Sequence, residues 1–429
     1  MITSVRRMAS LAPDLTALRA KVTTASPARA WTFVRDLVLR DGSDEALELA
    51  DEFAAATDVT TDKLLRFWPK TPDPDAFAKF LLAPAFVREG RTGLELRRRT
   101  SLTGLRHLTS LRTLRLDECE ALTDLSELAG LTGLEKLNLE GDFAVTDLSA
   151  LLGLRSLRWL NVRRSGVRGL AGVGALRSLA YLDASYCPSL DDVSPLAGLR
   201  ELVELNLSGT GIESVAGLRG LDSLAVLGLD CPRLTSLDGV ESMPALRELR
   251  LSDATRLKSL DGLGHHPHLT RLDLPFTALP DLRPLSRLPA LTEIQIQHDQ
   301  RLTSLDGLEG HPSISSVVLT ATTEVTDFSA LFTMPRLRRL VLRGLDGLSD
   351  LGGFSGLRDL EYLELVDNGG LRTLGDLSDL PSLRSVHISE CPSLADLGTL
   401  LALPALETIQ VDQWTVTPDE LKASGLLKA

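Results

Sequence analysis

The strongest constraint on this 429-residue chain is a short internal repeat. A Leu-x-x-Leu-x-Leu block begins at Leu111 and begins again at Leu134, after a degenerate first copy at Leu94-Glu-Leu96. Self-similarity at a fixed short period is the signature of stacked repeat architectures, so the chain is predicted to form a solenoid. The blocks follow in steps of 22 or 23 residues and begin at Leu111, Leu134, Leu157, Leu179, Leu202, Leu224, Leu246, Leu269, Leu291, Ile314, Leu337, Leu360, Leu383 and Leu406.

Each repeat has two halves with different hydrophobic periods. Leu114 and Leu116 alternate with Arg115, which predicts a strand with one buried face. After a turn, leucines recur at every third residue, a spacing that aligns side chains along a 3₁₀ helix. A repeat of this length is too short to add a long α-helix. The predicted fold is therefore an α/β solenoid, a horseshoe with a parallel concave sheet and a convex side of 3₁₀ or short turns.

The segments Val145-Thr-Asp-Leu-Ser-Ala-Leu151 and Leu190-Asp-Asp-Val-Ser-Pro-Leu196 refine this prediction. Together with the registered blocks, they resemble the leucine-rich repeat superfamily over about residues 91–413. The resemblance is to the short-repeat subclass found in bacterial internalins and in a eukaryotic phosphatase regulator. It implies a protein that works by binding other proteins. No signal-peptide pattern and no immunoglobulin-like module is recognised, so we expect a non-secreted, cytoplasmic member.

The ends of the chain carry no repeat, which predicts three regions: 1–90, 91–413 and 414–429. Residues 1–90 are expected to form either a helical cap over the open end of the solenoid or a small docking domain. A capping box from Thr417 to Glu420 predicts a C-terminal capping helix to about Leu427. The N-terminal helices are predicted near Pro13–Lys21, Pro27–Asp41, Ser43–Ala56, Thr61–Trp68 and Pro74–Leu82.

Charge and composition limit the classes of partner. The net charge of −12 and the isoelectric point of about 5.2 argue against non-specific binding to nucleic acid or to an anionic membrane. No apolar run reaches the roughly 18 residues that a membrane span needs. Lysine is scarce relative to arginine, a bias typical of GC-rich bacterial genomes.

The four cysteines, Cys119, Cys187, Cys231 and Cys391, each lie three residues before the first leucine of a convex run. Asn368 holds the equivalent position in its own repeat. No two cysteines are in neighbouring repeats, and strands two apart are separated by about 10 Å, beyond disulfide reach. We predict four free, mostly buried thiols. The resemblance implies an inward ladder of Asn or Cys side chains that bond to the turns.

The histidines form the one cluster with metal-ligating potential, at His265, His266 and His268. His266 and His311 align with leucines at the last apolar position before a strand. The favoured interpretation is a tolerated substitution at a partly exposed corner, with a fortuitous metal site as the alternative. No phosphate loop, zinc-protease motif or Cys-x-x-Cys is present, so we predict no catalytic residue, no cofactor and no enzyme activity.

The concave face is the predicted partner-binding surface, because aromatic and arginine side chains gather among its exposed strand positions. Trp159 and Tyr181 are expected about 5 Å apart as one apolar shelf, flanked by arginines that would meet an acidic group on a protein or peptide. The full set of predicted partner-binding residues is Trp159, Asn161, Arg163, Arg164, Tyr181, Asp183, Tyr186, Arg339, Arg343 and Tyr362.

Three other functions remain open from the sequence. The chain could be a sensor or specificity subunit that recruits an enzyme through residues 1–90, in bacterial defence or peptide modification. It could be an enzyme whose active site lies in the N-terminal helices. It could bind nucleic acid through a row of arginines, namely Arg158, Arg163, Arg164 and Arg168.

Overall fold

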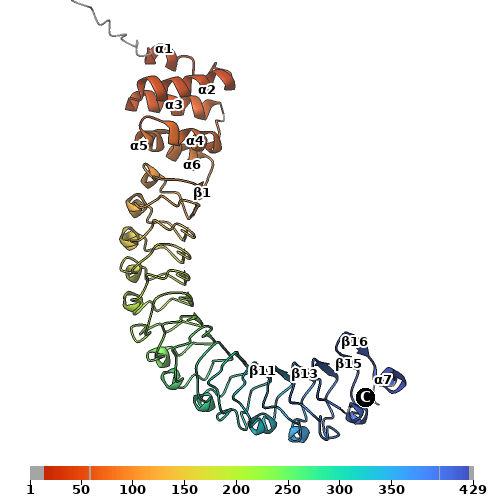
Figure 1. The fold of residues 1–429 in the computed structure, drawn as a ribbon. Coiled ribbons are helices and arrows are strands. Elements are labelled where there is room, and N and C mark those ends of the chain that lie inside the picture. The colour runs from red at the N-terminus through yellow and green to blue at the C-terminus, as the bar shows by residue number, and fades with distance from the viewer. Residues whose placement is uncertain (1–13, 58, 396, 425–429) are drawn as a thin grey trace, which may run out of the picture. The chain divides into compact units, whose positions relative to one another are not determined.

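A computed structural model describes residues 14–57, 59–395 and 397–424 of the protein. These residues divide into two compact units. The N-terminal unit comprises the described residues up to Val167 together with Ala171–Leu179, and the C-terminal unit comprises Arg168–Leu170 and the described residues from Ala180 onward. Figure 1 colours the chain from red to blue along this order.

The N-terminal unit begins with helices whose first turns are closed by short polar side chains. Asp14, Ser43 and Asp73 each accept hydrogen bonds from backbone N–H groups at a helix start. The buried side chains of Phe53, Phe77 and Leu64 form their core. The elements are α1 (Leu15–Arg19), α2 (Pro27–Asp36), a π turn (Leu37–Asp41), α3 (Asp44–Ala56), α4 (Thr61–Phe67), a 3₁₀ turn (Trp68–Lys70), α5 (Pro74–Phe77), a π turn (Ala78–Leu82) and α6 (Ala83–Arg88).

All five predicted N-terminal ranges contain a helix, with two differences. Pro13, the predicted start of the first, lies outside the described residues. The last range was predicted to end at Leu82, but helical structure continues through α6 to Arg88. The physical reason is that a proline is tolerated in the first turn of a helix, where its missing N–H has no intrahelical partner, so Pro84 does not end the run.

The repeats of the N-terminal unit stack as parallel strands. Leu94 pairs with Leu114, Leu114 with Leu137 and Leu137 with Leu160, so the buried leucines of successive repeats lie in one row. In Figure 1 the strands of this unit lie on one side of the rungs and the 3₁₀ turns on the other. The strands are β1 (Gly93–Arg97), β2 (Thr113–Asp117), β3 (Lys136–Asn138) and β4 (Trp159–Asn161).

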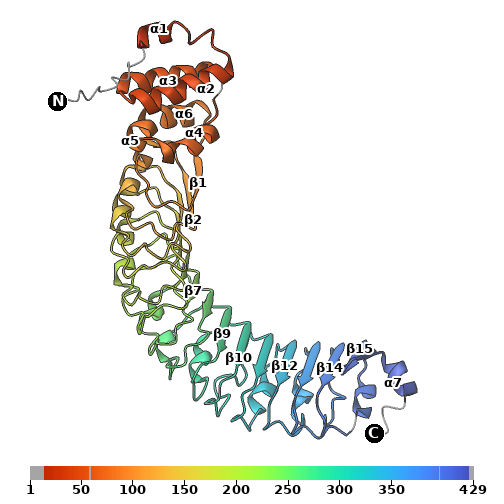
Figure 2. The ribbon, with the colours of Figure 1, turned by 45° about the horizontal axis from the view of Figure 1, so that its top comes forward.

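The C-terminal unit continues the pattern through a second parallel run, and Figure 2 shows its strands side by side from β9 to β15. Its strands are β5 (Tyr181–Asp183), β6 (Glu204–Asn206), β7 (Val226–Gly228), β8 (Glu248–Arg250), β9 (Arg271–Pro275), β10 (Glu293–Gln297), β11 (Ser316–Thr320), β12 (Arg339–Arg343), β13 (Tyr362–Val366), β14 (Ser385–Ser389), β15 (Thr408–Val411) and β16 (Trp414–Val416).

The C-terminus closes the sheet differently from the expectation of a helix alone. β16 turns back and pairs antiparallel with β15, joining Val411 to Trp414. Helix α7 (Pro418–Ser424) follows, with Thr417 and Glu420 forming the predicted reciprocal capping bonds. The rest of the predicted helix, to Leu427, lies outside the described residues. A hairpin at this point pairs the open edge of β15, which would otherwise expose unpaired backbone groups.

The side opposite the sheet consists of 3₁₀ turns in most repeats and of other short turns between β6 and β7, β10 and β11, and β13 and β14, as predicted. Leu122, Leu125, Leu128 and Leu131 are all buried. No helix among the described residues is long and apolar enough to cross a membrane. The turns are η4 (Leu105–His107), η5 (Ser126–Gly130), η6 (Ser149–Gly153), η7 (Val173–Ala175), η8 (Ser194–Leu196), η9 (Val240–Ser242), η10 (Asp261–Leu263), η11 (Arg283–Arg287), η12 (Ser329–Thr333), η13 (Phe354–Gly356) and η14 (Gly398–Ala402).

Candidate partner-binding site on the sheet face

The cysteines lie in the column of turn residues that follows each strand, as predicted. None of the four cysteines forms a disulfide; Cys119, Cys187 and Cys231 are buried and Cys391 is half-buried. The Cys231 thiol donates to the carbonyl oxygen of Leu207, 3.1 Å away, and burial raises its pKa. Burial also raises the pKa of Cys119 and Cys391, and a buried thiol with a raised pKa is a poor nucleophile, which fits a role in satisfying turn groups.

The same column contains two buried carboxylates that sequence reasoning missed. Asp142 and Asp299 lie three residues before an apolar residue, the spacing of the cysteines, and that spacing was the available signal. Asp299 accepts hydrogen bonds from Thr277 Oγ1 and from the N–H groups of Leu279, Arg301 and Leu302. Asp142 accepts one, from the N–H of Cys119 at 2.9 Å. The column therefore tolerates charge, at differing cost.

The predicted exposure of His266 and His311 was wrong, because both rings are buried, His266 with only 1% exposed. Each takes the place of a core leucine, and the neighbouring repeats cover it. His311 Nε2 lies 3.1 Å from the carbonyl oxygen of Leu288, and burial lowers the pKa of both histidines. Neutral imidazoles thus fill core positions. In the part of the chain that the structure describes, no three His, Cys, Asp or Glu side chains gather as a metal site.

We use the term sheet face for the side chains that alternate with the buried strand leucines and point away from the core. Two predicted site residues on it, Asn161 and Asp183, are buried, so the expectation that they are exposed is wrong. Asn161 Oδ1 accepts from the N–H of Arg163, and Asp183 Oδ1 from the N–H of Ser185. In both cases a short polar side chain folds back onto the N–H two residues on and closes the turn after its strand.

The N-terminal unit places Trp159 beside a hollow of about 670 Å³ in the sheet face. Gly93, Thr113, Lys136 and Trp159 occupy one column of adjacent strands, so side-chain size increases along it. The two small residues leave the depression, and Lys136 and Trp159 bound it on one side. The half-exposed indole is therefore available as one wall of a shallow site.

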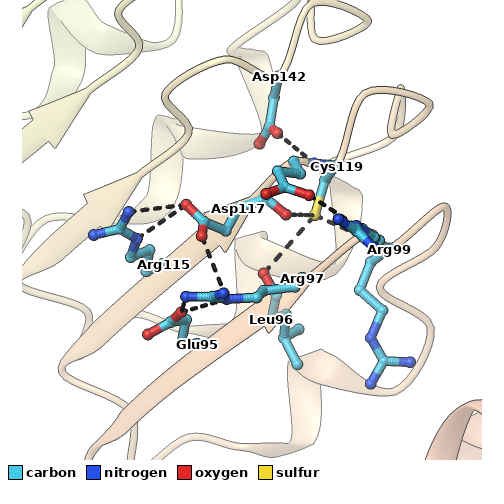
Figure 3. Close-up of polar contacts among 10 residues, drawn as sticks. Glu95, Leu96, Arg97, Arg99, Arg115, Asp117, Cys119 and Asp142 are labelled. Carbon is cyan, nitrogen blue, oxygen red and sulfur yellow. Dashed lines mark hydrogen bonds and ion pairs between the residues drawn. The ribbon is translucent and has the colours of Figure 1, made fainter.

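Next to this hollow, three ion pairs link four side chains in a row, which Figure 3 shows. Arg97 Nη2 lies 2.7 Å from Glu95 Oε1, and Arg115 Nη2 lies 2.9 Å from Asp117 Oδ1. Arg97 Nε also lies 3.4 Å from Asp117 Oδ2. Because these charges satisfy one another at the surface, the row of ion pairs orients side chains but leaves little charge for a partner.

The C-terminal unit gathers three of the predicted residues with two others into one cluster on β12, β13 and β14. We call it the Arg–Tyr cluster: the predicted Arg339, Arg343 and Tyr362, together with Glu364 and His387. The register sets Arg339 beside Tyr362 and Glu364 beside His387. The guanidinium of Arg339 lies over the Tyr362 ring, 4.9 Å from its centroid. The structure thus brings together Arg339, Arg343 and Tyr362, three residues that the sequence placed in one patch.

Glu364 is the hub of the Arg–Tyr cluster and is only 3% exposed. Tyr362 donates its hydroxyl proton to Glu364 Oε2 at 2.5 Å, and Arg343 Nε donates to Oε1 at 2.7 Å. His387 Nδ1 lies 4.0 Å from Oε1. Burial acts to raise the pKa of Glu364, but the hydrogen bonds outweigh it and the pKa lies below its ordinary value. Glu364 is therefore ionised and holds Tyr362 and Arg343 in place.

The predicted shelf of Trp159 and Tyr181 joins residues of different units, and its geometry stays a prediction. In the N-terminal unit, Arg163 Nε lies 3.7 Å from Glu140 Oε1, so its charge is shared, while Arg164 is exposed at the turn after its strand. In the C-terminal unit, Tyr181 is half-buried and Tyr186 is half-exposed.

Phe276 and His298 are further exposed rings on the C-terminal unit that sequence reasoning missed. Their rings stack with centroids 4.7 Å apart and planes 10° apart. Both follow a strand at the turn position that Tyr186 also holds, with φ near +55°. The signal for them in the sequence was this shared position, directly after a strand, where an aromatic side chain is held at the surface.

These features define a repeat solenoid with polar and aromatic clusters on its strands, and comparison with known proteins identifies the class. A family model described as a leucine-rich repeat region matches residues 92–388. The chain belongs to the leucine-rich repeat family, and the predicted solenoid fold is confirmed.

Two solved structures show similar folds. An internalin (inlF) from Listeria monocytogenes has a TM-score of 0.54 at 19% identity, over 88% of this chain and 96% of that one. A leucine-rich-repeat protein from Leptospira interrogans has a TM-score of 0.53 at 19% identity, over 74% of this chain and 87% of that one. At such identities the likeness concerns the fold alone. A search of curated proteins finds no match.

Proposed function

We propose that the chain is a non-catalytic binding protein whose sheet face holds an acidic segment of a partner protein or peptide. The observation that carries the proposal is the guanidinium of Arg339. It lies on the Tyr362 ring, is exposed at the surface, and has no carboxylate within ion-pair distance among the described residues. An arginine that is already positioned and not neutralised favours a carboxylate from outside.

The surroundings of Arg339 support a preorganised site. Glu364 fixes the Tyr362 ring through its hydroxyl group, and the ring in turn supports the guanidinium. Side chains that are already ordered lose little rotamer freedom when a partner binds, so less of the interaction energy is lost. Val318 and Val366, half-buried on neighbouring strands, offer apolar contact beside the charge. An acidic residue followed by an aliphatic one fits this arrangement.

Selection from a random peptide display library with the full chain as bait tests the proposal. We expect enrichment of sequences with Asp or Glu next to an apolar residue. Arg339→Ala should weaken the selected peptides by about tenfold or more, which is about 1.4 kcal/mol. The weakening should shrink as salt is raised, because the contact is partly exposed.

Arg338→Ala is the matched control, because it removes the same charge one residue away. Arg338 is exposed and its Nη1 lies 3.3 Å from Glu361 Oε1, so its charge is already paired. Its loss should change peptide affinity less than twofold. If peptides bind Arg339→Ala as tightly as the unaltered chain, or if no peptide is enriched, the sheet face at this cluster is not the binding site.

The second function proposed from the sequence, recruitment of an enzyme through residues 1–90, has one supporting observation. The helices α2 to α6 carry their own buried core, including Phe53, Phe77 and Phe86. On their surface Val87 is 69% exposed and Leu39 is 46% exposed. Those apolar residues would contact a recruited protein, and Val87→Asp would then abolish recruitment without affecting peptide binding. We also propose a cytoplasmic location, which cell fractionation tests.

A further inference from the structure

Arg99 is an unusual residue for its position in the repeat. It lies three residues before Leu102, in the turn column that elsewhere contains Cys119, Asp142 and Asn368. A guanidinium is too long to fold inward there as a thiol does. Figure 3 shows the Arg99 side chain extending away from Cys119, Asp117 and Asp142, although its backbone N–H donates to Cys119 Sγ. The Arg99 guanidinium therefore lies outside the turn column.

The Arg99 guanidinium lies over the Trp68 ring, 5.2 Å from its centroid. Trp68 is 3% exposed, and its indole N–H donates to the carbonyl oxygen of Pro74 at 2.9 Å, so the ring is a fixed platform. Arg99 itself is half-buried, and burial lowers its pKa. Folding therefore already removes part of the water from this cation. A later contact with an anion needs less desolvation of the guanidinium and is stronger for that reason.

No carboxylate lies within ion-pair distance of Arg99 among the described residues, whereas its neighbours are paired. Arg97 contacts Glu95 and Asp117, and Arg98 Nε lies 2.7 Å from Glu118 Oε2. A half-buried charge normally has a partner, because removing it from water is costly. Arg99 therefore differs from Arg97 and Arg98, because its half-buried charge has no carboxylate partner among the described residues.

A pocket of about 220 Å³ opens beside this guanidinium, between the Trp68 corner and the turn after β1. Arg98, Thr100, Ser101 and Thr103 line it with Arg99. The hydroxyl groups of Ser101 and Thr103 lie 2.7 Å apart, and the N–H of Thr103 donates to Ser101 Oγ. The pocket is thus lined by the Arg99 guanidinium and by hydroxyl groups, and one hydroxyl group of the Ser101–Thr103 pair keeps its proton for another acceptor.

We propose that this pocket binds phosphate or a phosphate monoester. Several donors that converge from different directions suit a group with three terminal oxygens better than a planar carboxylate with two. Arginine presents two parallel N–H donors to such an oxyanion, and the hydroxyl group of Thr100 and one of the paired Ser101 and Thr103 hydroxyl groups can supply further bonds. The pocket is independent of the Arg–Tyr cluster, which belongs to the other unit.

Isothermal titration of the full chain with inorganic phosphate and with O-phosphoserine tests the proposal, with sodium chloride at matched ionic strength as reference. We expect saturable binding of at least one of the two probes. Tighter binding of phosphoserine would assign the site to a phosphate ester, and equal binding to phosphate itself. Arg99→Ala should weaken binding by about tenfold or more, and Arg99→Lys by less, because lysine keeps the charge but not the two parallel donors.

Arg97→Ala is the matched control, because it removes an equal charge that is already paired and lies outside the pocket; it should leave phosphate affinity within twofold. Thr103→Val keeps Arg99 and removes one hydroxyl group, so it should weaken phosphate by severalfold even if Arg99→Ala fails to fold. No saturable binding of either probe, or equal binding to all these variants, would overturn the proposal and leave Arg99 as a structural partner of Trp68.

Discussion

Two buried carboxylates, one in each unit, show how the same repeat treats a charge in different surroundings. Glu364 of the C-terminal unit accepts hydrogen bonds from Tyr362 and Arg343. Asp142 of the N-terminal unit is 0% exposed and accepts one from Cys119, while its Oδ2 has no hydrogen-bond partner among the described residues. Burial disfavours both charges. The pKa of Glu364 nevertheless lies below its ordinary value, whereas burial raises that of Asp142 to about 6.

The difference follows from what each position can reach. A carboxylate on the sheet face meets long side chains from neighbouring strands, so arginine and tyrosine can donate to it. A carboxylate in the turn column meets backbone N–H groups, whose number is set by the local turn. The sheet face can therefore hold a charged network at little cost. The turn column suits a carboxylate where several donors meet, as at Asp299, and elsewhere a neutral side chain such as the amide of Asn368.

A third carboxylate, placed where no donor exists at all, should give the largest effect. Leu249 is buried in the middle of β8, and Leu249→Asp would leave a charge without any partner. We expect a loss of about 4 kcal/mol or more in the free energy of unfolding, measured by urea titration. The exposed neighbour Arg250 provides the control, since Arg250→Ala should cost only about 0.5 kcal/mol. Equal losses would mean that the inside and outside of the strand had been exchanged.

Asp142→Asn should stabilise the protein at neutral pH. Asn368 shows how an amide fits this column, accepting from the N–H of Leu345 at 3.0 Å and donating to the carbonyl oxygen of Leu342 at 2.9 Å. A pKa raised from 3.8 to about 6 means that the folded state binds the proton more tightly than the unfolded chain does. Stability from this group is present at low pH and is lost as pH rises through about 6, with a cost on the order of 2–3 kcal/mol at pH 7.5.

The measurement is the free energy of unfolding of both proteins between pH 4 and 8. The gain from Asp142→Asn should be full near pH 7.5 and should disappear near pH 4, where the unaltered Asp142 is protonated as well. A gain that does not change with pH would refute a raised pKa as its cause.

Asp299→Asn is the same substitution in the same column and should have the opposite sign. Both oxygens of Asp299 already accept two hydrogen bonds each, and an amide can accept at only one of its two positions. Loss of these acceptors should cost about 1–3 kcal/mol in the free energy of unfolding. Stabilisation by both substitutions would show that any neutral side chain is preferred in the column, whatever its donors.

The fold could be predicted from the sequence to a greater extent than the site. A leucine period of two and then three is repeated in every copy, so strands and 3₁₀ turns were assigned many times over. The geometry of the site depends on the contacts of individual side chains. The repeat predicts only on which face of the sheet each side chain begins. Asn161 was expected to meet a partner, yet it bonds to the N–H of Arg163. The β16 hairpin and the Glu364 network were missed because both depend on contacts that occur once.

Glu364→Gln tests the carboxylate whose hydrogen bonds outweigh its burial. A neutral amide keeps the shape but loses the charge that Arg343 and Tyr362 bind, so we expect a loss of about 1.5 kcal/mol in the free energy of unfolding at pH 7. The pKa of Glu364 is lower in the folded state than in the unfolded chain. Its contribution to the free energy of unfolding is therefore present at pH values above its ordinary pKa, and it is lost as the pH falls through its folded pKa. The difference between the two proteins should therefore vanish in acid. A difference that persists at pH 2 would point to packing and not to charge.

Tyr362→Phe should have the smallest effect on stability. It distinguishes the contribution of the Tyr362 hydroxyl group to stability from the contribution of the ring to peptide binding. The substitution removes the hydroxyl group that donates to Glu364 but keeps the ring beneath Arg339. Glu364 retains its bond from Arg343, so the expected loss in the free energy of unfolding is about 1 kcal/mol or less. Peptide affinity should fall less than with Tyr362→Ala, because only the latter removes the surface on which the guanidinium lies. If Tyr362→Phe weakens binding as much as Tyr362→Ala does, then the Glu364 bond, and not the ring, positions Arg339.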